Sequence, residues 1–354
     1  MSYMGGMLGE DRKYGFVLGR GSARVISREQ LEKNQVWLYA FVLIIAAGTG
    51  LLWPESSKSL DSMISFILAI LMYGMFAQIP FFRLKEALTN RKFTYALLVT
   101  NYIAVPILVW GLTRFLPTDP AILLGVLLVL LTPCIDYVIV FTHLGRGNEK
   151  LVLVSTPILF VTQMLLLPIY LWLFMGTTSA EIVSVGPFLE AFLGLIVVPL
   201  VLALLTQWWS RRQPNGERFL DATAWLPVPF MALTLFIVVA SQIAKLYTSF
   251  HFISQVIPVY VAYMAITPII ARIVSRIFRL DTGAGRALIF SAGTRNSLVV
   301  LPFALALPEP LNGVVSAVIV TQTIVELIGE LLYIRLVPNL LLRETNGYAE
   351  NKNK

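Results

Sequence analysis

Long apolar stretches alternate with short polar segments along the whole chain. Each stretch has about 18 residues or more, which is the length that an α-helix needs to cross a hydrocarbon layer of roughly 30 Å. The chain is therefore predicted to be an all-α polytopic membrane protein. Ten transmembrane helices are expected, at residues 36–53, 62–82, 93–116, 120–143, 151–175, 183–208, 226–244, 252–275, 285–307 and 311–337.

The ten expected spans form two groups of five, so the second group enters the membrane from the side opposite to the first. This predicts two inverted five-helix repeats, and Gln78 and Gln242, each before an isoleucine near the end of a span, support it. In the first tail, Ser27 stands three residues before Gln30, a capping-box pattern that predicts a short interfacial helix. The chain is expected to consist of an N-terminal tail (residues 1–35), a first repeat (36–175), a second, inverted repeat (183–338) and a C-terminal tail (339–354).

Composition and charge agree with this prediction. Hydrophobic residues make up 57% of the chain and charged residues 13%, whereas soluble domains carry roughly a quarter charged residues. All but four of the 27 lysines and arginines fall in the tails and in the loops on one side of the predicted membrane. Such an excess marks the cytoplasmic side. Both termini are therefore expected in the cytoplasm and the protein in the inner (plasma) membrane, and the net charge of +7 does not indicate nucleic acid as a partner.

Two of the expected spans are interrupted by residues that disfavour a helix. The fourth, "LLTPCIDYVIVFTH", contains Thr132 and Pro133, and proline lacks a backbone donor. The ninth contains "SAGTRNS", in which Ala292-Gly293 lets the chain leave helical geometry. Free backbone groups inside a membrane are tolerated only where they line a cavity or contact protein. Interruptions at matching positions of two inverted halves predict a substrate site, although a proline alone can be only a kink.

Three segments carry more specific motifs. "TPCIDYVIVFTHLGRGN" contains a Pro-Cys pair and ends in a Leu-x-x-Gly-Asn turn, "SAGTRNSLVVLPFALALP" contains Thr294 and Asn296 in a Ser/Thr-x-Asn element, and "TQTIVELIGELLYIRLVP" contains Glu326. They resemble the fourth, ninth and tenth helices of arsenite permeases in the bile acid/arsenite/riboflavin transporter superfamily. The resemblance covers all ten spans. It implies one bundle that forms a panel and another that forms a core, with helices 4 and 9 crossing at their interruptions.

The chain departs from these families at a few positions. Arsenite permeases usually have a glutamate where this chain has Leu298. The sodium-coupled branch has a glutamate and a glutamine where this chain has Ser291 and Arg295, and another glutamine where it has Met75. A sodium ion needs several oxygen ligands and would be repelled by a guanidinium. We therefore expect coupling to protons, through buried carboxyl groups, rather than to sodium.

The interruptions supply the candidate substrate residues. Arsenite and antimonite, which are neutral trihydroxides at pH 7, are soft centres that favour the sulfur of Cys134. The alternative is that a lone membrane cysteine is only a small apolar residue. The substrate is expected to bind among Thr132, Pro133, Cys134, Thr294, Arg295 and Asn296.

Charged residues in this region are the candidates for proton coupling. Asp136 and Arg295 are expected to pair if the interruptions cross. The pair is either structural or a coupling device in which Asp136 gains a proton and releases Arg295. As a third possibility, Arg295 binds an anionic substrate. The resemblance makes Glu326 a proton-relay candidate, whereas Glu330, one turn later, lies closer to Arg335 and can pair with it near the interface.

No HExxH, GxSxG, P-loop or dinucleotide-binding motif occurs, so the sequence indicates neither an enzyme nor a cofactor. We predict a secondary transporter that exports arsenite, with antimonite as a related substrate, by proton antiport; its partners are membrane lipid, the metalloid oxyacid and protons. The first alternative is a proton-coupled, sodium-independent carrier of a small organic anion that binds at Arg295. The second is a membrane sensor or scaffold, which would have no need of costly buried charges.

Overall fold

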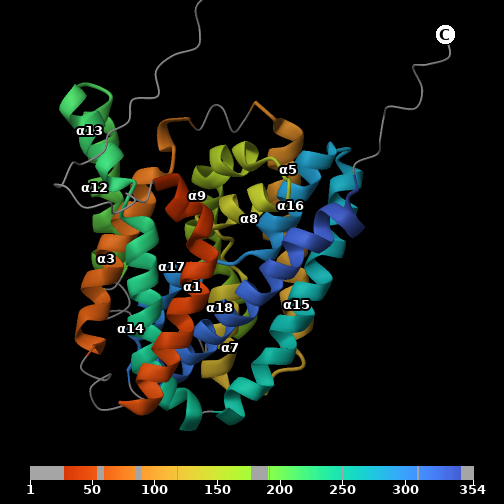
Figure 1. Ribbon diagram of the computed structural model, residues 1–354. Helices are drawn as coiled ribbons and strands as arrows, with labels where there is room; N and C mark the ends of the chain where they lie inside the picture. The colour runs from red at the N-terminus through yellow and green to blue at the C-terminus, as the bar shows by residue number, and fades with distance from the viewer. Residues whose placement is uncertain are drawn as a thin grey trace, which may run out of the picture.

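The computed structural model describes residues 28–53, 60–83, 89–117, 119–176, 190, 192–248, 250–308 and 311–343. Within these residues the regular elements are helices (Figure 1). The α-helices are α1 (Arg28–Leu52), α3 (Asp61–Gln78), α5 (Arg91–Val99), α6 (Val105–Thr113), α7 (Pro120–Leu130), α8 (Val138–Leu144), α9 (Glu149–Met175), α12 (Val198–Ser210), α13 (Pro214–Thr223), α14 (Pro227–Thr248), α15 (Phe250–Ile277), α16 (Thr282–Gly293), α17 (Ser297–Leu305) and α18 (Leu311–Leu336). The described residues also contain one 3-10 helix, η1 (Phe81–Arg83), and three π-helices, η2 (Thr100–Ala104), η3 (Leu193–Val197) and η4 (Val337–Leu341).

Every predicted span contains helix, which confirms a helical polytopic membrane protein. By length and composition, six helical stretches are able to cross a membrane: Arg91–Thr113, Glu149–Met175, Leu193–Ser210, Pro214–Ser241, Ile253–Ile277 and Leu311–Leu341. Shorter apolar helices occur at Trp37–Leu52, Met63–Gln78 and Pro120–Leu130. α1 begins at Arg28, in the segment predicted to be an interfacial helix, and runs without a break into the first expected span. Ser27 and the start of the sixth expected span, at residue 183, lie outside the described residues.

The second expected span ends earlier than predicted. α3 stops at Gln78 rather than at residue 82, because Pro80 follows and cannot donate a helical hydrogen bond. The Gln207 amide of α12 donates to the carbonyls of Phe76 and Ile79 at 3.1 and 2.8 Å. These carbonyls also accept from the backbone N–H groups of Ile79 and Phe81, so a side chain from a distant helix adds a second donor where the regular bonding of α3 stops.

Two of the π-helices stand directly before a proline. η2 leads into α6, whose second residue is Pro106, and η3 leads into α12, whose second residue is Pro199. A proline ring clashes with the carbonyl four residues before it, and a wider π turn is one way for a helix to accommodate such a residue. Both spans therefore remain continuous helices.

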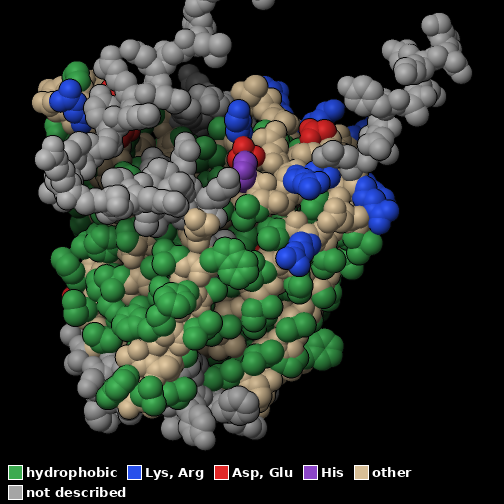
Figure 2. Space-filling model, in the orientation of Figure 1, with side chains coloured by type: hydrophobic (Ala, Val, Ile, Leu, Met, Phe, Trp, Pro, Cys, Tyr) green, Lys and Arg blue, Asp and Glu red, His purple; other side chains and the backbone are tan. Residues whose placement is uncertain are grey.

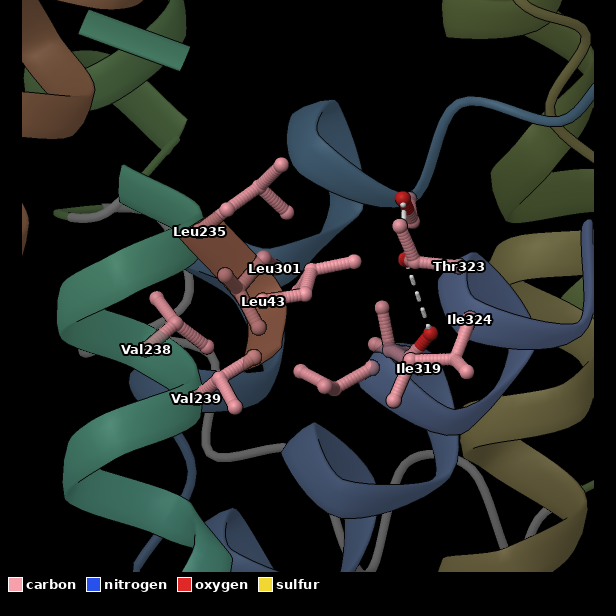
Figure 3. A pocket seen from close by; sticks show the side chains of 10 residues that line it. Leu43, Leu235, Val238, Val239, Leu301, Ile319, Thr323 and Ile324 are labelled. Carbon is pink, nitrogen blue, oxygen red and sulfur yellow. Dashed lines mark hydrogen bonds between the residues drawn. The ribbon is translucent and has the colours of Figure 1, made fainter. Parts of the chain in front are cut away.

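The helices pack as two groups (Figure 1). We call the group of α1, α3, α12 and α14 the panel and the group of α5 to α9 and α15 to α18 the core bundle. The groups meet where α14 packs against α18. A cavity of about 10 Å³ lies between them, and Figure 3 shows Leu43 of α1, Val239 of α14 and Leu301 of α17 around it. This division agrees with the panel and core that the resemblance implies.

The outer surface shows how the protein lies in a membrane. Large apolar side chains such as Trp37, Phe66 and Trp172 are at least two-thirds exposed, and soluble proteins rarely expose wide apolar surfaces. Figure 2 shows hydrophobic side chains over the middle of the molecule and lysines and arginines gathered toward the end at which α13 and α5 lie. The protein is a multi-pass membrane protein.

Candidate functional site

Both interruptions predicted from the sequence are present. α7 ends at Leu130 and α8 begins at Val138, whereas α16 ends at Gly293 and α17 begins at Ser297. The fourth and ninth expected spans are therefore each two short helices. We call the two connecting segments, residues 131–137 and 294–296, the first and the second interruption.

The two interruptions cross as a short antiparallel bridge. The Cys134 N–H donates to the Thr294 carbonyl at 3.1 Å. The Asn296 N–H donates to the Thr132 carbonyl at 2.8 Å. Each segment thus satisfies main-chain groups of the other, as a membrane interior requires. The crossing brings together the residues predicted for the substrate site, Thr132, Pro133, Cys134, Thr294, Arg295 and Asn296.

Threonines occupy corresponding places at the two helix ends. The Thr132 hydroxyl donates to the Leu128 carbonyl at 2.8 Å, and the Thr294 hydroxyl donates to the Phe290 carbonyl at 2.7 Å. Both bonds run back four residues to the helix that is ending, which is a common way for this side chain to satisfy a carbonyl. The ends of α7 and α16 are therefore built alike.

Glu326 of α18 contacts both interruptions with one carboxyl group. The Tyr137 hydroxyl, at the end of the first interruption, donates to Glu326 Oε1 at 2.7 Å. The Arg295 N–H, in the second, donates to Oε2 at 2.7 Å, and the Gln322 amide also donates to Oε2. The Tyr137 oxygen lies 3.1 Å from the Arg295 carbonyl as well. Glu326 is 1% exposed, so this buried carboxyl ties the crossing to α18.

The Arg295 guanidinium is turned toward helix ends. It is fully buried and donates to the carbonyls of Ser291 and Ala292 at 2.9 and 2.5 Å. It also donates to Asn101 Oδ1 of η2 at 2.8 Å and faces the Leu130 carbonyl at 3.4 Å. The proposed pairing of Asp136 with Arg295 stays a prediction.

Cys134 lies inside this polar cluster. Its thiol is free and fully buried, and it is within electrostatic reach of the carboxyl groups of Glu326 and Asp136. Asp136 is half-buried. The one sulfur of the first interruption therefore lies two residues from Asp136, in the segment that Tyr137 links to Glu326.

Two residues of the cluster were missed from the sequence. Glu330 is fully buried and accepts from the Thr294 hydroxyl at 3.0 Å, a contact that the sequence did not predict. Its spacing of four residues from Glu326 was the available signal. Tyr137 gave no signal, because tyrosines in membrane helices are often only interfacial anchors.

Interrupted apolar helices that meet in a buried polar cluster are typical of membrane transporters. The chain matches the Sodium Bile acid symporter family over residues 65–249, which is more than half of its length, and it belongs to that family. It is 23% identical over 283 residues to the "Uncharacterized sodium-dependent transporter YocS" of Bacillus subtilis, covering 80% of this chain and 84% of the relative. It is 22% identical over 296 residues to the "Arsenical-resistance protein Acr3" of Corynebacterium glutamicum, covering 77% and 79%. These findings confirm the superfamily and a membrane transporter.

Proposed function

We propose that this transporter exports arsenite in exchange for protons. The observation that carries the proposal is the position of Cys134, whose thiol is fully buried and whose N–H forms part of the crossing. Arsenic(III) is a soft centre that favours sulfur over oxygen ligands. The similarity to an arsenical-resistance protein over 77% of the chain supports the same substrate class.

Binding would exchange one arsenic-bound hydroxyl for the thiol. An As–S bond forms, the As–O bond breaks, and the thiol proton leaves with the hydroxide as water. Attack by water reverses the step and releases arsenite, and no electrons are transferred. A single sulfur ligand gives a weak complex, which suits a carrier that must release its substrate.

Buried polar atoms near the crossing are candidates for the remaining hydroxyls. Asn296 Nδ2, Gln322 Oε1 and Glu330 Oε2 have no hydrogen-bond partner within the described part of the chain. Such atoms are rare in folded proteins, and a hydroxyl can both donate to the oxygens and accept from the amide. The proposed substrate site comprises Thr132, Pro133, Cys134, Thr294, Arg295 and Asn296.

Glu326 and Asp136 are proposed to carry the protons. An ionised Glu326 accepts from the Tyr137 hydroxyl, whereas a protonated one can donate to the Tyr137 oxygen. Tyr137 is then free to donate to the Arg295 carbonyl, 3.1 Å away. One proton would thus change the contacts of both interruptions, which a coupling residue needs to do.

The proposed architecture is that of ten transmembrane helices in two inverted repeats, residues 36–175 and 183–338. Because Cys134 is fully buried, arsenite would reach it through a movement of the panel against the core bundle. The concentration of basic residues at one end supports a plasma-membrane protein with both termini in the cytoplasm.

A carrier of organic anions at Arg295 has less support. Three of the four oxygens that face the guanidinium are main-chain carbonyls that accept from its two terminal nitrogens. Only Nε has no partner within the described residues, so a carboxylate held by both terminal nitrogens would have to displace these carbonyls.

Arsenite uptake by everted membrane vesicles tests the proposal. The vesicles carry an inside-acid proton gradient, and a protonophore serves as the control for the gradient. We expect uptake that depends on the gradient and falls about tenfold in Cys134→Ser, the factor that about 1.4 kcal/mol of binding free energy produces. If well-folded wild-type protein moves no arsenite, this substrate is rejected.

A further inference from the structure

Four oxygens face the two terminal nitrogens of the Arg295 guanidinium, and three of them belong to helix ends. Leu130 is the last residue of α7, and Ser291 and Ala292 lie in the last turn of α16. Carbonyls in the last turn of a helix lack the partner that the next turn would supply. The fourth oxygen is Asn101 Oδ1, at 2.8 Å.

Asn101 is held in place for this contact. Its amide nitrogen donates to the Leu97 carbonyl at 3.1 Å and to the Ser291 hydroxyl at 3.3 Å. These bonds turn Oδ1 toward the guanidinium. The oxygens therefore form a fixed cradle made by α7, α16 and η2, rather than a chance contact of a flexible side chain.

The electrostatics of this cradle favour a cation. A helix C-terminus carries the equivalent of roughly half a negative charge, and the C-terminal ends of α7 and α16 both face this point. Tyr263 of α15 adds its ring, with its centre 5.6 Å from the guanidinium carbon, and its hydroxyl donates to the Ala292 carbonyl at 2.7 Å. The carboxyl groups of Glu326 and Glu330 are also within electrostatic reach of Arg295.

Carbonyl and amide oxygens at half-helix C-termini are the ligands that transporters offer to a coupling cation. Here an arginine side chain takes that place. We propose that the Arg295 guanidinium is a resident cation in a site for monovalent cations formed by Leu130, Ser291, Ala292 and Asn101. The protein therefore needs no free metal cation, and loss of the side chain opens the site to one.

This inference deepens the proposed function, because it explains why a proton-coupled carrier of this family would not use sodium. Its consequence for transport rests on the proposed function. It gives Arg295 a positioning role: the guanidinium holds the ends of α7 and α16 together while the Arg295 main chain forms part of the crossing. The binding property itself does not depend on the identity of the substrate.

Thermal unfolding of the purified full-length chain tests the site directly. Arg295→Ala is compared in choline, sodium and guanidinium chlorides at equal, low millimolar concentration, far below denaturing levels. We expect a lower Tm in choline and a saturable recovery of several degrees with sodium or guanidinium, since a ligand that binds the folded state stabilises it. Wild type and Arg276→Ala, which loses an exposed guanidinium of α15, should not respond.

The proposal is overturned if the Tm of Arg295→Ala is the same in all three salts. If that variant does not fold in any of them, Arg295→Gln decides, because glutamine fills more of the space and carries no charge. An Arg295→Gln protein with no preference for sodium or guanidinium over choline also overturns the proposal.

Transport provides the second readout. Uptake by wild type should be the same in sodium and choline, whereas uptake by Arg295→Ala should require sodium or guanidinium. If wild type moves no arsenite, the arsenite proposal fails while the Tm measurement still tests the cation site. A sodium requirement of the wild-type protein would contradict the inference.

Discussion

The two interruptions meet in one antiparallel bridge but arise from different sequences. The first spans seven residues and contains Pro133, which removes a helical donor whatever surrounds it. The second spans three residues and contains no proline. It follows Gly293, where an added Cβ would lie 2.5 Å from the Tyr333 ring. The first interruption is thus imposed locally, and the second depends on packing against α18.

The difference extends to the chemistry of the two segments. The first carries Cys134, a soft ligand, and the second carries Arg295, a fixed charge. The family match, at residues 65–249, covers the first and ends before the second. Under the proposed function, the substrate ligand and the buried guanidinium belong to different interruptions, and Glu326 is bonded to both segments.

Replacing that connection should have the largest effect. In Glu326→Gln, the amide nitrogen would face the Arg295 N–H or the Tyr137 hydroxyl, and no proton could be exchanged. We expect gradient-driven arsenite uptake to fall to background, while arsenite exchange without a gradient persists. Everted vesicles measure both. Glu217→Gln, which neutralises an exposed glutamate of α13, is the control and should keep gradient-driven uptake; equal loss in both variants would mean that the loss is not specific to Glu326.

A smaller change separates the two interruptions. Tyr137→Phe breaks the bond from the first interruption to Glu326 and leaves the bond from the Arg295 N–H in place. A hydrogen bond to a charged group contributes about 1.5–3 kcal/mol, so we expect the gradient-driven rate to fall about tenfold or more.

Tyr260→Phe is the control, because that hydroxyl is equally buried and donates only to the Val318 carbonyl, at 3.0 Å. Stabilisation of the Tyr137→Phe protein by arsenite should stay as in wild type. If Tyr260→Phe lowers the rate as much, the loss reflects general packing rather than the link to Glu326.

Sequence reasoning located the main chain of the site better than its side chains. Pro133 removes a backbone donor and Gly293 permits the chain to leave helical geometry, so both interruptions could be placed, and the resemblance added that they cross. Where a long side chain points is decided by neighbours that are distant in sequence. The Arg295 guanidinium reaches Asn101, 194 residues away, and Tyr137 reaches Glu326, 189 residues away.

The burial of Glu330 also could not be predicted from the sequence. Helical periodicity placed it on one face with Glu326, but it could not show how far the core bundle extends along α18. The structure places Thr294 against Glu330, so the second interruption covers both carboxyls. A periodicity argument assigns a face of a helix, whereas the depth of a residue depends on the helices around it.

The dependence of the second interruption on packing can be tested by adding one methyl group. Gly293→Ala would force the new Cβ against the Tyr333 ring, and such overpacking typically costs about 1–3 kcal/mol. We expect a clearly lower Tm for the purified protein. Gly111→Ala is the control, because a Cβ there meets nothing within 4 Å. A Tm of Gly293→Ala equal to that of the control would mean that α18 does not hold this interruption.

The smallest expected difference lies between the corresponding threonines. Thr132→Val removes a hydroxyl that donates only to carbonyls of its own helix, those of Leu128 and Val129. Thr294→Val also removes the donor to Glu330 Oε1 and leaves a buried carboxyl oxygen unsatisfied. Leaving such a group unpaired costs about 1–3 kcal/mol, so Thr294→Val should lower the Tm more than Thr132→Val. Equal Tm shifts in the two variants would show that Glu330 finds another donor when the Thr294 hydroxyl is removed. The bond from Thr294 to Glu330 would then not stabilise the second interruption.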